Sequence, residues 1–574
     1  MQDFAKVIQN SFNFAKIQKT MFRMKGYRCL NSVLILVICM IAFGCKKKNE
    51  VAEKAANISP NAAKVAEYAY FDLKSPLLAE LSDDEKRLLP IFVRISEIMD
   101  DLFWKQTFGD KSILDTIRDE YTKDFAMIQY GPWDRLDENA PFVTGYGSKP
   151  LGCQYYPTDI TAEEYAAYQH PDKGSLYTVL RRNAEGALQT VWYHDEYKAE
   201  IDEVCALLDS AIAIAEDPYM RKYLQERKKA FQTDDYRASD IAWLDMKSGK
   251  LDFVFGPIEN YDDNLNNAKA SYEAFILVKD EGRSSDLSRF IKMLPELQLE
   301  LPCAPEYKTF IPGTSSDLNV YDVVYYAGDC NAGSKTIAIN LPNDDKIQAE
   351  KGTRRLQLRN SMQAKFDKIM IPIGDLVLSE SDKQHLKFDA FFWNVTFHEV
   401  AHGLGIKQTI NGKGSVDEAM KTQRSNWEEA KADILGLFMV CKLIEKGEIT
   451  NITVEDAMVT YLVGLFRSVR FGAGEAHGIA NAMCFNYMDM KNAFTRNEDG
   501  LYHINYKNFK AAIEGWANAI LTTQGDGNFE FAEKFAKQHG KISGEMKEDI
   551  QRINVSSVPR DIRFNEGLKI MGLE

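Results

Sequence analysis

Two histidines one helical turn apart are the residues of this sequence best suited to chemistry. His398 and His402 belong to an HExxH pattern in the segment FFWNVTFHEVAHGLG, with Glu399 between them. Histidines at positions i and i+4 share one face of a helix, so both imidazoles can reach a single Zn²⁺. Glu399 lies beside them, where its carboxylate can accept a proton from an attacking water. The pattern therefore predicts a zinc hydrolase with Glu399 as the general base.

A catalytic zinc needs a third protein ligand besides the two histidines. Metzincins place a histidine three residues after the glycine that is Gly405 here, but that position holds Gln408. A second helical segment, NWEEAKADILGLFMV, supplies Glu429 and, one turn later, Asp433. This Glu-x-x-x-Asp spacing is typical of gluzincins, in which Glu binds the metal and the second acid orients a ligand histidine. Glu428 is another candidate for such an outer contact.

Each segment also has a plainer interpretation. The HExxH helix could be a core helix with hydrogen-bonded histidines, and EEAKAD could be an ordinary charged helix face. The apolar residues Phe391, Phe392, Val395 and Val400 indicate that the first helix is buried. Burying two histidines and a glutamate without partners is costly, so burial favours a metal site.

Together the two motifs resemble those of the dipeptidyl peptidase III (M49) zinc peptidases. That family carries HExxH, or a form one residue longer, followed by EExxA(E/D). EEAKAD at positions 428–433 matches the second motif in full, and HEVAH is similar to the shorter form of the first. The resemblance extends over roughly residues 90–560 and implies a two-lobed peptidase.

Three further segments carry the resemblance. GPIENYDD resembles the family's cleft strand, which implies that Glu259 and Tyr261 contact the substrate. AINLPNDDKIQ resembles the segment that binds the peptide N-terminus, which implies Asn340 and Asn343. GEAHGIANAMCFNY resembles the helix whose histidine steadies the scissile carbonyl, which implies His477. Taken singly, each would more often be a turn or capping residue.

One position departs from the family pattern. Enzymes with the longer motif have an Arg four residues after the histidine that matches His477, whereas this chain has Asn481. Binding of a peptide's N-terminal ammonium does not need that Arg. The carboxylate of Glu259 and the amide oxygens of Asn340 and Asn343 can accept all three N–H donors of the ammonium.

The predicted activity is therefore zinc-dependent hydrolysis of short peptides from a free N-terminus, with release of dipeptides. Glu399, Tyr261 and His477 would be catalytic, the last two by hydrogen bonding to the oxyanion. One alternative is a zinc aminopeptidase or oligopeptidase that cleaves at another distance from the N-terminus. The other is a lipid-anchored protein that binds peptides without cleaving them.

The N-terminus resembles a bacterial lipoprotein signal. Basic residues precede an apolar run, Val33 to Phe43, which is followed by Gly44-Cys45. The run is shorter than the roughly 20 residues that span a bilayer. We expect Cys45 to carry a lipid and to hold the protein at the bacterial cell envelope, although Ala42 stands where Leu is usual. The alternative is an uncleaved signal anchor.

Composition limits the remaining possibilities. The 574 residues are 45% hydrophobic, enough for a large core, and the net charge of -14 argues against a nucleic-acid partner. The cysteines beyond Cys45 are widely spaced and indicate buried thiols, with Cys303–Cys330 as the one disulfide considered. They are Cys153, Cys205, Cys303, Cys330, Cys441 and Cys484.

Hydrophobic periodicity predicts an α+β fold of two lobes. Helical patterns dominate from about 68 to 250 and from 388 to about 540, whereas 251–345 contains short β-branched and aromatic runs. A mostly helical zinc-bearing lobe and a mixed lobe with a strand-rich core would enclose the active site in the cleft between them. The expected segments are a signal (1–45), a tether (46–66), the mixed lobe (67–280), an excursion joining the helical lobe (281–320), a strand-rich return (321–370), the zinc-binding lobe (371–550) and a C-terminal segment (551–574).

Overall fold

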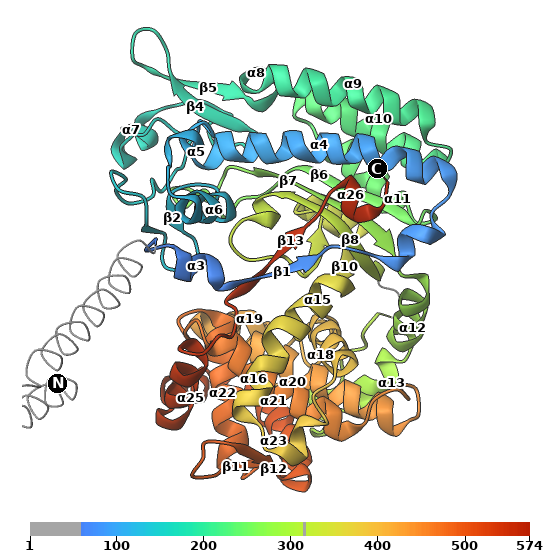
Figure 1. The fold of residues 1–574 in the computed structure, drawn as a ribbon. Helices are drawn as coiled ribbons and strands as arrows, with labels where there is room; N and C mark the ends of the chain where they lie inside the picture. Colours follow the sequence, from blue (N-terminus) through green and yellow to red (C-terminus); the bar gives the residue numbers. More distant parts are fainter. Residues whose placement is uncertain (1–58, 314–316, 574) are drawn as a thin grey trace, which may run out of the picture. The chain divides into compact units, whose positions relative to one another are not determined.

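The computed structural model describes residues 59–313 and 317–573. Residues Ala63–Glu574 form one compact unit, which combines a central sheet, its covering helices and a helical region (Figure 1). The predicted signal segment and Cys45 lie outside the described residues. Among the residues described, no helix is both long and apolar enough to cross a bilayer.

A five-stranded sheet forms the centre of the mixed lobe. Its strand order is β6-β7-β8-β10-β9, and all neighbours are antiparallel except the parallel pair β8 and β10. Most residues of β6 and β7 are buried on both faces, which explains their continuous apolar runs. The strands are β6 (Leu251–Glu259), β7 (Ser271–Lys279), β8 (Asp317–Gly328), β9 (Ala338–Leu341) and β10 (Arg354–Leu358).

Helices cover one face of this sheet. The longest, α4 (Asp83–Thr107), begins at a capping box in which Ser82 and Glu85 satisfy each other's backbone N–H groups. It packs on β7 and β8, and the ring of Phe92 stacks on that of Phe253 at 4.3 Å. The other helices of this layer are α9 (Lys198–Ile214), α10 (Pro218–Thr233) and α11 (Arg237–Asp245).

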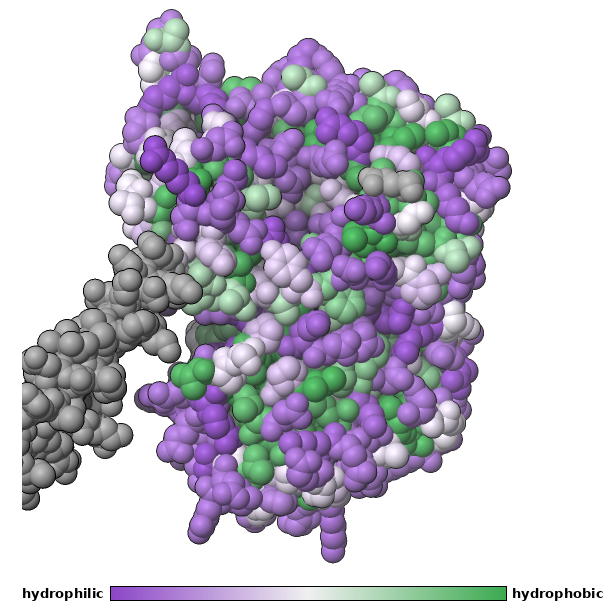
Figure 2. All heavy atoms as spheres, viewed as in Figure 1, coloured by the Kyte–Doolittle hydropathy of each residue, from purple (hydrophilic) through white to green (hydrophobic). Residues whose placement is uncertain are grey.

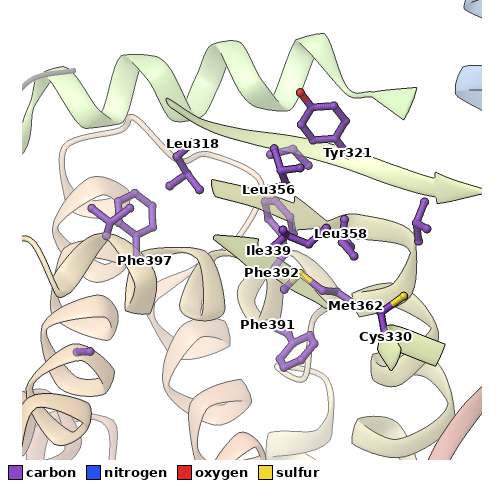
Figure 3. Close-up of a cluster of buried hydrophobic side chains, with 14 of the residues drawn as sticks. Leu318, Tyr321, Cys330, Ile339, Leu356, Leu358, Met362, Phe391, Phe392 and Phe397 are labelled. Carbon is purple, nitrogen blue, oxygen red and sulfur yellow. The ribbon is translucent and has the colours of Figure 1, made fainter. Parts of the chain in front are cut away.

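The opposite face of the sheet packs on the helix that carries the HExxH motif. Figure 3 shows Ile339, Leu356 and Leu358 of the strands beside Phe391 and Phe392 of α18 (Phe388–Ala401). From the side, α12 (Glu281–Lys292) joins this contact, with the Phe290 ring edge-on to Trp393 at 5.4 Å. The core therefore fixes α18 between the sheet and the rest of the helical lobe.

The remaining helices form the helical lobe, drawn in yellow to red in Figure 1. Helix α20 packs closely along α18, and α21 and α22 pack against α20. The lobe contains α16 (Ile371–Val377), α18, α19 (Val416–Met420), α20 (Arg424–Glu445), α21 (Val454–Val469), α22 (Ala476–Met490), α23 (Tyr506–Gly525), α24 (Phe529–His539) and α25 (Gly544–Asn554).

Smaller elements complete the chain. A hairpin of β4 and β5 and a parallel pair of β1 and β13 lie outside the main sheet. The strands are β1 (Tyr68–Asp72), β2 (Trp133–Asp134), β3 (Ala140–Pro141), β4 (Thr178–Arg182), β5 (Leu188–Trp192), β11 (Phe494–Arg496), β12 (Tyr502–Ile504) and β13 (Asp561–Asn565). The helices are α3 (Ala62–Ala66), α5 (Ile113–Thr116), α6 (Glu120–Gln129), α7 (Ala162–Ala167), α8 (Tyr193–Glu196), α13 (Leu294–Leu299), α14 (Asp345–Lys351), α15 (Arg359–Lys365), α17 (Glu380–Lys383) and α26 (Leu568–Met571).

The predicted α+β class with two lobes is confirmed. The hairpin β4–β5 and strand β10 were not predicted from the periodicity. All six cysteines in the described residues are free, so Cys303 and Cys330 do not form the disulfide that was considered. On the face drawn in Figure 2, hydrophilic side chains predominate and apolar ones form scattered patches.

Candidate metal centre

Two helices bring the motif residues together. His398 and Glu399 lie in the last turn of α18, and His402 follows as its C-cap with helical dihedral angles, so the one-turn spacing is kept. Helix α20 approaches so closely that a Cβ at Gly436 would lie 2.8 Å from the backbone nitrogen of His398. Glycine at this position therefore lets Glu429 face the two imidazoles.

The side chains of His398, His402 and Glu429 form a group that could hold a metal ion. One ligand atom from each lies within 4.8 Å of the others. Glu429 Oε2 is 3.3 Å from His398 Nε2 and 3.9 Å from His402 Nε2. This buried oxygen has no well-formed hydrogen bond, which is consistent with a role as a metal ligand.

The other ring nitrogens are held by carboxylates. His398 Nδ1 donates to Asp433 Oδ1 at 2.7 Å, and His402 Nδ1 donates to Glu428 Oε1 at 3.0 Å. A carboxylate can only accept, so each Nδ1 would keep its proton when metal binds, and each Nε2 would be the ligand atom. The residues present thus fit a divalent metal with two imidazoles and one carboxylate as ligands.

The electrostatics of the group favour positive charge. Burial acts to lower the pKa of His398, but Asp433 and Glu429 beside it raise that pKa to about 10. Burial acts to raise the pKa of Glu428, but the hydrogen bond from His402 and the charge of Lys431 bring it down to about 2. An environment that retains protons on an imidazole so strongly also stabilises a bound cation.

Two lysines that the motif analysis did not single out support this network. Lys431, almost fully buried, contacts Glu428 Oε1 at 2.8 Å and donates to the carbonyl of Leu404 at 3.1 Å. Lys407 donates to the carbonyl of His402 at 2.7 Å. Lys431 could have been found in the sequence, because it follows Glu428 by three residues on the same helix face.

Helix α22 supplies two more residues of the group. His477 Nε2 lies 3.1 Å from Glu429 Oε2, although its side chain is 67% exposed. Asn481, which is buried, donates to Asp433 Oδ2 at 3.2 Å and to the carbonyl of His477 at 2.7 Å. The asparagine therefore links His477 to the carboxylate that orients His398.

The residues implied for substrate contact lie on the mixed lobe. Glu259 ends β6, and Asn343 donates to its Oε2 at 3.0 Å. Burial raises the pKa of Glu259, and this hydrogen bond partly offsets the effect. Tyr261 is 75% exposed, and Asn340 is an exposed residue of β9. Within the described residues, no hydrogen bond or ion pair joins these four residues to the metal group.

Strand β10 provides a direct contact between the sheet and the metal-site helix. Arg355, which pairs with Asn340 across β9 and β10, donates from Nη1 to the carbonyl of Glu399 at 3.3 Å. Sequence reasoning missed this residue because, although residues 321–370 were expected to be rich in strands, no individual strand was placed at 354–358.

Comparison with known proteins agrees with this geometry. The sequence model of peptidase family M49 matches residues 178–432. The solved structure of DPP III from Caldithrix abyssi is 34% identical, with a TM-score of 0.83 over 88% of this chain and 98% of the other. Dipeptidyl-peptidase III from Corallococcus sp. strain EGB is 33% identical, with a TM-score of 0.71 over 87% and 95% of the two chains.

A curated relative gives a match of similar extent. Nudix hydrolase 3 of Arabidopsis thaliana is 31% identical over 553 residues, which cover 84% of this chain and 71% of the plant protein. The name describes that whole protein, which extends beyond the matched region.

The fold and the two-histidine, one-glutamate group are those of a metallopeptidase. The chain belongs to peptidase family M49, whose solved members include the two dipeptidyl peptidases III, and peptides are its substrates.

Proposed function

We propose that this protein is a zinc peptidase that binds short peptides by their free N-terminus and releases dipeptides. The observation that carries the proposal is the convergence of two Nε2 atoms on the buried Oε2 of Glu429, while both Nδ1 atoms are held by carboxylates. Two nitrogens and one oxygen with an open fourth position are typical of catalytic zinc.

The chain's own residues then have distinct tasks. Zinc, when bound, supplies Lewis acidity toward the scissile carbonyl and lowers the pKa of water. Glu399 lines the same cavity as His398 and His477, so it is placed to take the proton of the attacking water and pass it to the leaving amine. Arg355 fixes the backbone of Glu399 through its carbonyl. His477 and Tyr261 would donate to the developing oxyanion.

The proposed anchor for the substrate's ammonium is Glu259 with Asn340 and Asn343. The hydrogen bond from Asn343 already orients the Glu259 carboxylate, and burial strengthens its interaction with a positive charge. Because this anchor lies at a fixed distance from the metal site, it fixes how many residues separate the peptide N-terminus from the cleaved bond. The names of the two solved relatives, which are dipeptidyl peptidases, support two residues.

Digestion of one unblocked hexapeptide and its N-acetylated twin, followed by mass spectrometry, tests this proposal. We expect a dipeptide as the first product, and cleavage of the acetylated peptide at least about a hundredfold slower because the half-buried Glu259 carboxylate loses its counter-charge. Glu259→Gln should reduce the difference in rate between the two peptides, because it slows cleavage of the free peptide. Release of single residues would indicate an aminopeptidase, and equal rates on both peptides would indicate an oligopeptidase without the anchor.

We also propose that Cys45 carries a lipid that holds the enzyme at the bacterial cell envelope. The support is the sequence pattern of basic residues, apolar run and Gly44-Cys45. Detergent phase partitioning of the expressed full chain tests it: the wild type should enter the detergent phase and Cys45→Ser should not. Equal partitioning of both proteins would contradict lipidation.

A further inference from the structure

A cavity of about 200 Å³ lies beside the metal group, between helices α18, α20, α21 and α22. His398, Glu399 and His477 line one part of it, and the apolar side chains of Phe391 and Val395 line another. Arg467, on α21, also lines this cavity, and it has no role in the proposed catalytic mechanism.

Arg467 is half-buried, and it lacks the carboxylate partner that several other arginines of the described residues have. It makes no ion pair within the described residues, and its buried Nε has no hydrogen-bond acceptor. Its charge is held over the ring of Phe391, with 5.6 Å from Cζ to the ring centroid. By contrast, a carboxylate lies within 3 Å of three other arginines that are half-buried or buried, namely Arg135 with Asp262, Arg227 with Asp240 and Arg354 with Asp252.

The two carboxylates that act electrostatically on Arg467 are already used. Asp433 accepts from His398 and from Asn481. Asp561 pairs with Lys365 at 3.1 Å and accepts the backbone N–H of Lys335 at 3.0 Å. The guanidinium therefore lacks an anionic partner among the described residues, and it lines a cavity where a ligand could supply one.

We propose that Arg467 binds a carboxylate of the substrate on the leaving side of the cleaved bond. This inference rests on the proposed peptidase function, in which Glu259 and the asparagines hold the other end. A guanidinium can form two parallel hydrogen bonds with a carboxylate, a geometry that a lysine cannot match. The apolar walls accept the carbon skeleton beside it.

The carboxylate has two possible sources. It is the C-terminal group when the substrate is a short peptide that ends in the cavity. It is an Asp or Glu side chain when a longer peptide passes through. Arg467 thus makes the enzyme selective for a negative charge just beyond the scissile bond.

Measurement of kcat/KM on matched peptides with the zinc-loaded full chain separates these sources. One pair is a tetrapeptide with a free C-terminus and its C-terminal amide. The other pair is an amidated hexapeptide with Asp or Asn as its third residue. In the wild type we expect the charged member of at least one pair to be preferred by about tenfold or more, as for hydrogen bonds to charged groups.

In Arg467→Met this preference for the charged peptide should fall to about onefold. Arg87→Met removes an exposed arginine on α4 and should leave the preference unchanged. The melting temperature of Arg467→Met should change little, because the substitution breaks no ion pair within the described residues. Equal rates within both pairs for the wild type, or a preference that survives in Arg467→Met, would overturn the proposal. Failure to hydrolyse any peptide would instead contradict the peptidase function itself.

Discussion

At the scale of single residues, the metal centre separates metal binding from proton transfer. His398, His402 and Glu429 face one another, whereas Glu399 lies next to His398 in sequence and is absent from the group of ligand atoms. Glu399 can therefore be changed without removing a ligand. Its carbonyl, which Arg355 holds, belongs to the backbone and survives any substitution of the side chain.

We predict that Glu399→Gln retains metal and loses activity. Glutamine has the same size and hydrogen-bonding reach but cannot accept the water proton, so kcat should fall by at least about a hundredfold. Steady-state kinetics together with metal analysis of the same sample measures both quantities. Near-normal turnover with full metal content would show that another residue activates the water.

The residues of this site were unequally predictable from the sequence. The two histidines are one helical turn apart, and so are Glu429 and Asp433 of EEAKAD, so helical spacing alone placed each pair on a common face. Arg355 and Arg467 gave no such signal, because their roles depend on which elements pack together. Asn481 was noticed only as a departure from the family pattern, and its contact with Asp433 required the fold.

At the scale of elements, the spacing of α18 and α20 decides whether the ligands can converge. Gly436 on α20 lies against the backbone of Phe397 and His398, where an added Cβ would meet atoms at 2.8 to 3.1 Å. Backbone atoms cannot rotate away as a side chain can. The close approach of the two helices thus depends on this glycine.

Gly436→Ala should therefore destabilise the protein and weaken metal binding. Overpacking of this kind costs about 1 to 3 kcal/mol, more than the roughly 1 kcal/mol that Ala gains over Gly in a helix. Gly464→Ala on α21 is the matched control, because its Cβ would meet only the end of Met370 at 4.0 Å. Thermal unfolding of both variants decides the question, and equal effects would contradict the role of close packing at Gly436.

Element prediction succeeded where local pattern was strong. The apolar runs that became β6, β7 and β8 were found, and so were the helices that carry both motifs. Within the expected strand-rich segment 321–370, the position of β10 was missed because RRLQL has two adjacent arginines and no β-branched residue.

At the scale of the whole molecule, strands near the two ends of the described chain pair with each other. Strands β1 and β13 pair in parallel, with Tyr68 opposite Asp561, and Ile562 of β13 is fully buried. Local periodicity cannot predict such a pairing across hundreds of residues, although it did predict the α+β class. Buried Asp561 also pairs with Lys365 of α15, which follows β10 in the sequence.

Asp561→Asn should destabilise the whole molecule. Lys365 would keep a buried charge without its partner, a change that typically costs about 3 to 5 kcal/mol. Adding Lys365→Met removes that charge and should recover most of the lost free energy of unfolding. Asn at position 561 keeps an acceptor for the backbone N–H of Lys335, so this hydrogen bond is retained. Denaturant unfolding of the single and double variants measures this coupling, and purely additive effects would speak against it.

Zinc content of the purified protein tests the central claim most directly. Mass spectrometry of metals should find about one zinc per chain in the wild type and in Glu533→Ala, an exposed change on α24, and little or none in His402→Ala or Glu429→Ala. Full zinc content in both ligand variants would contradict the metal centre described here.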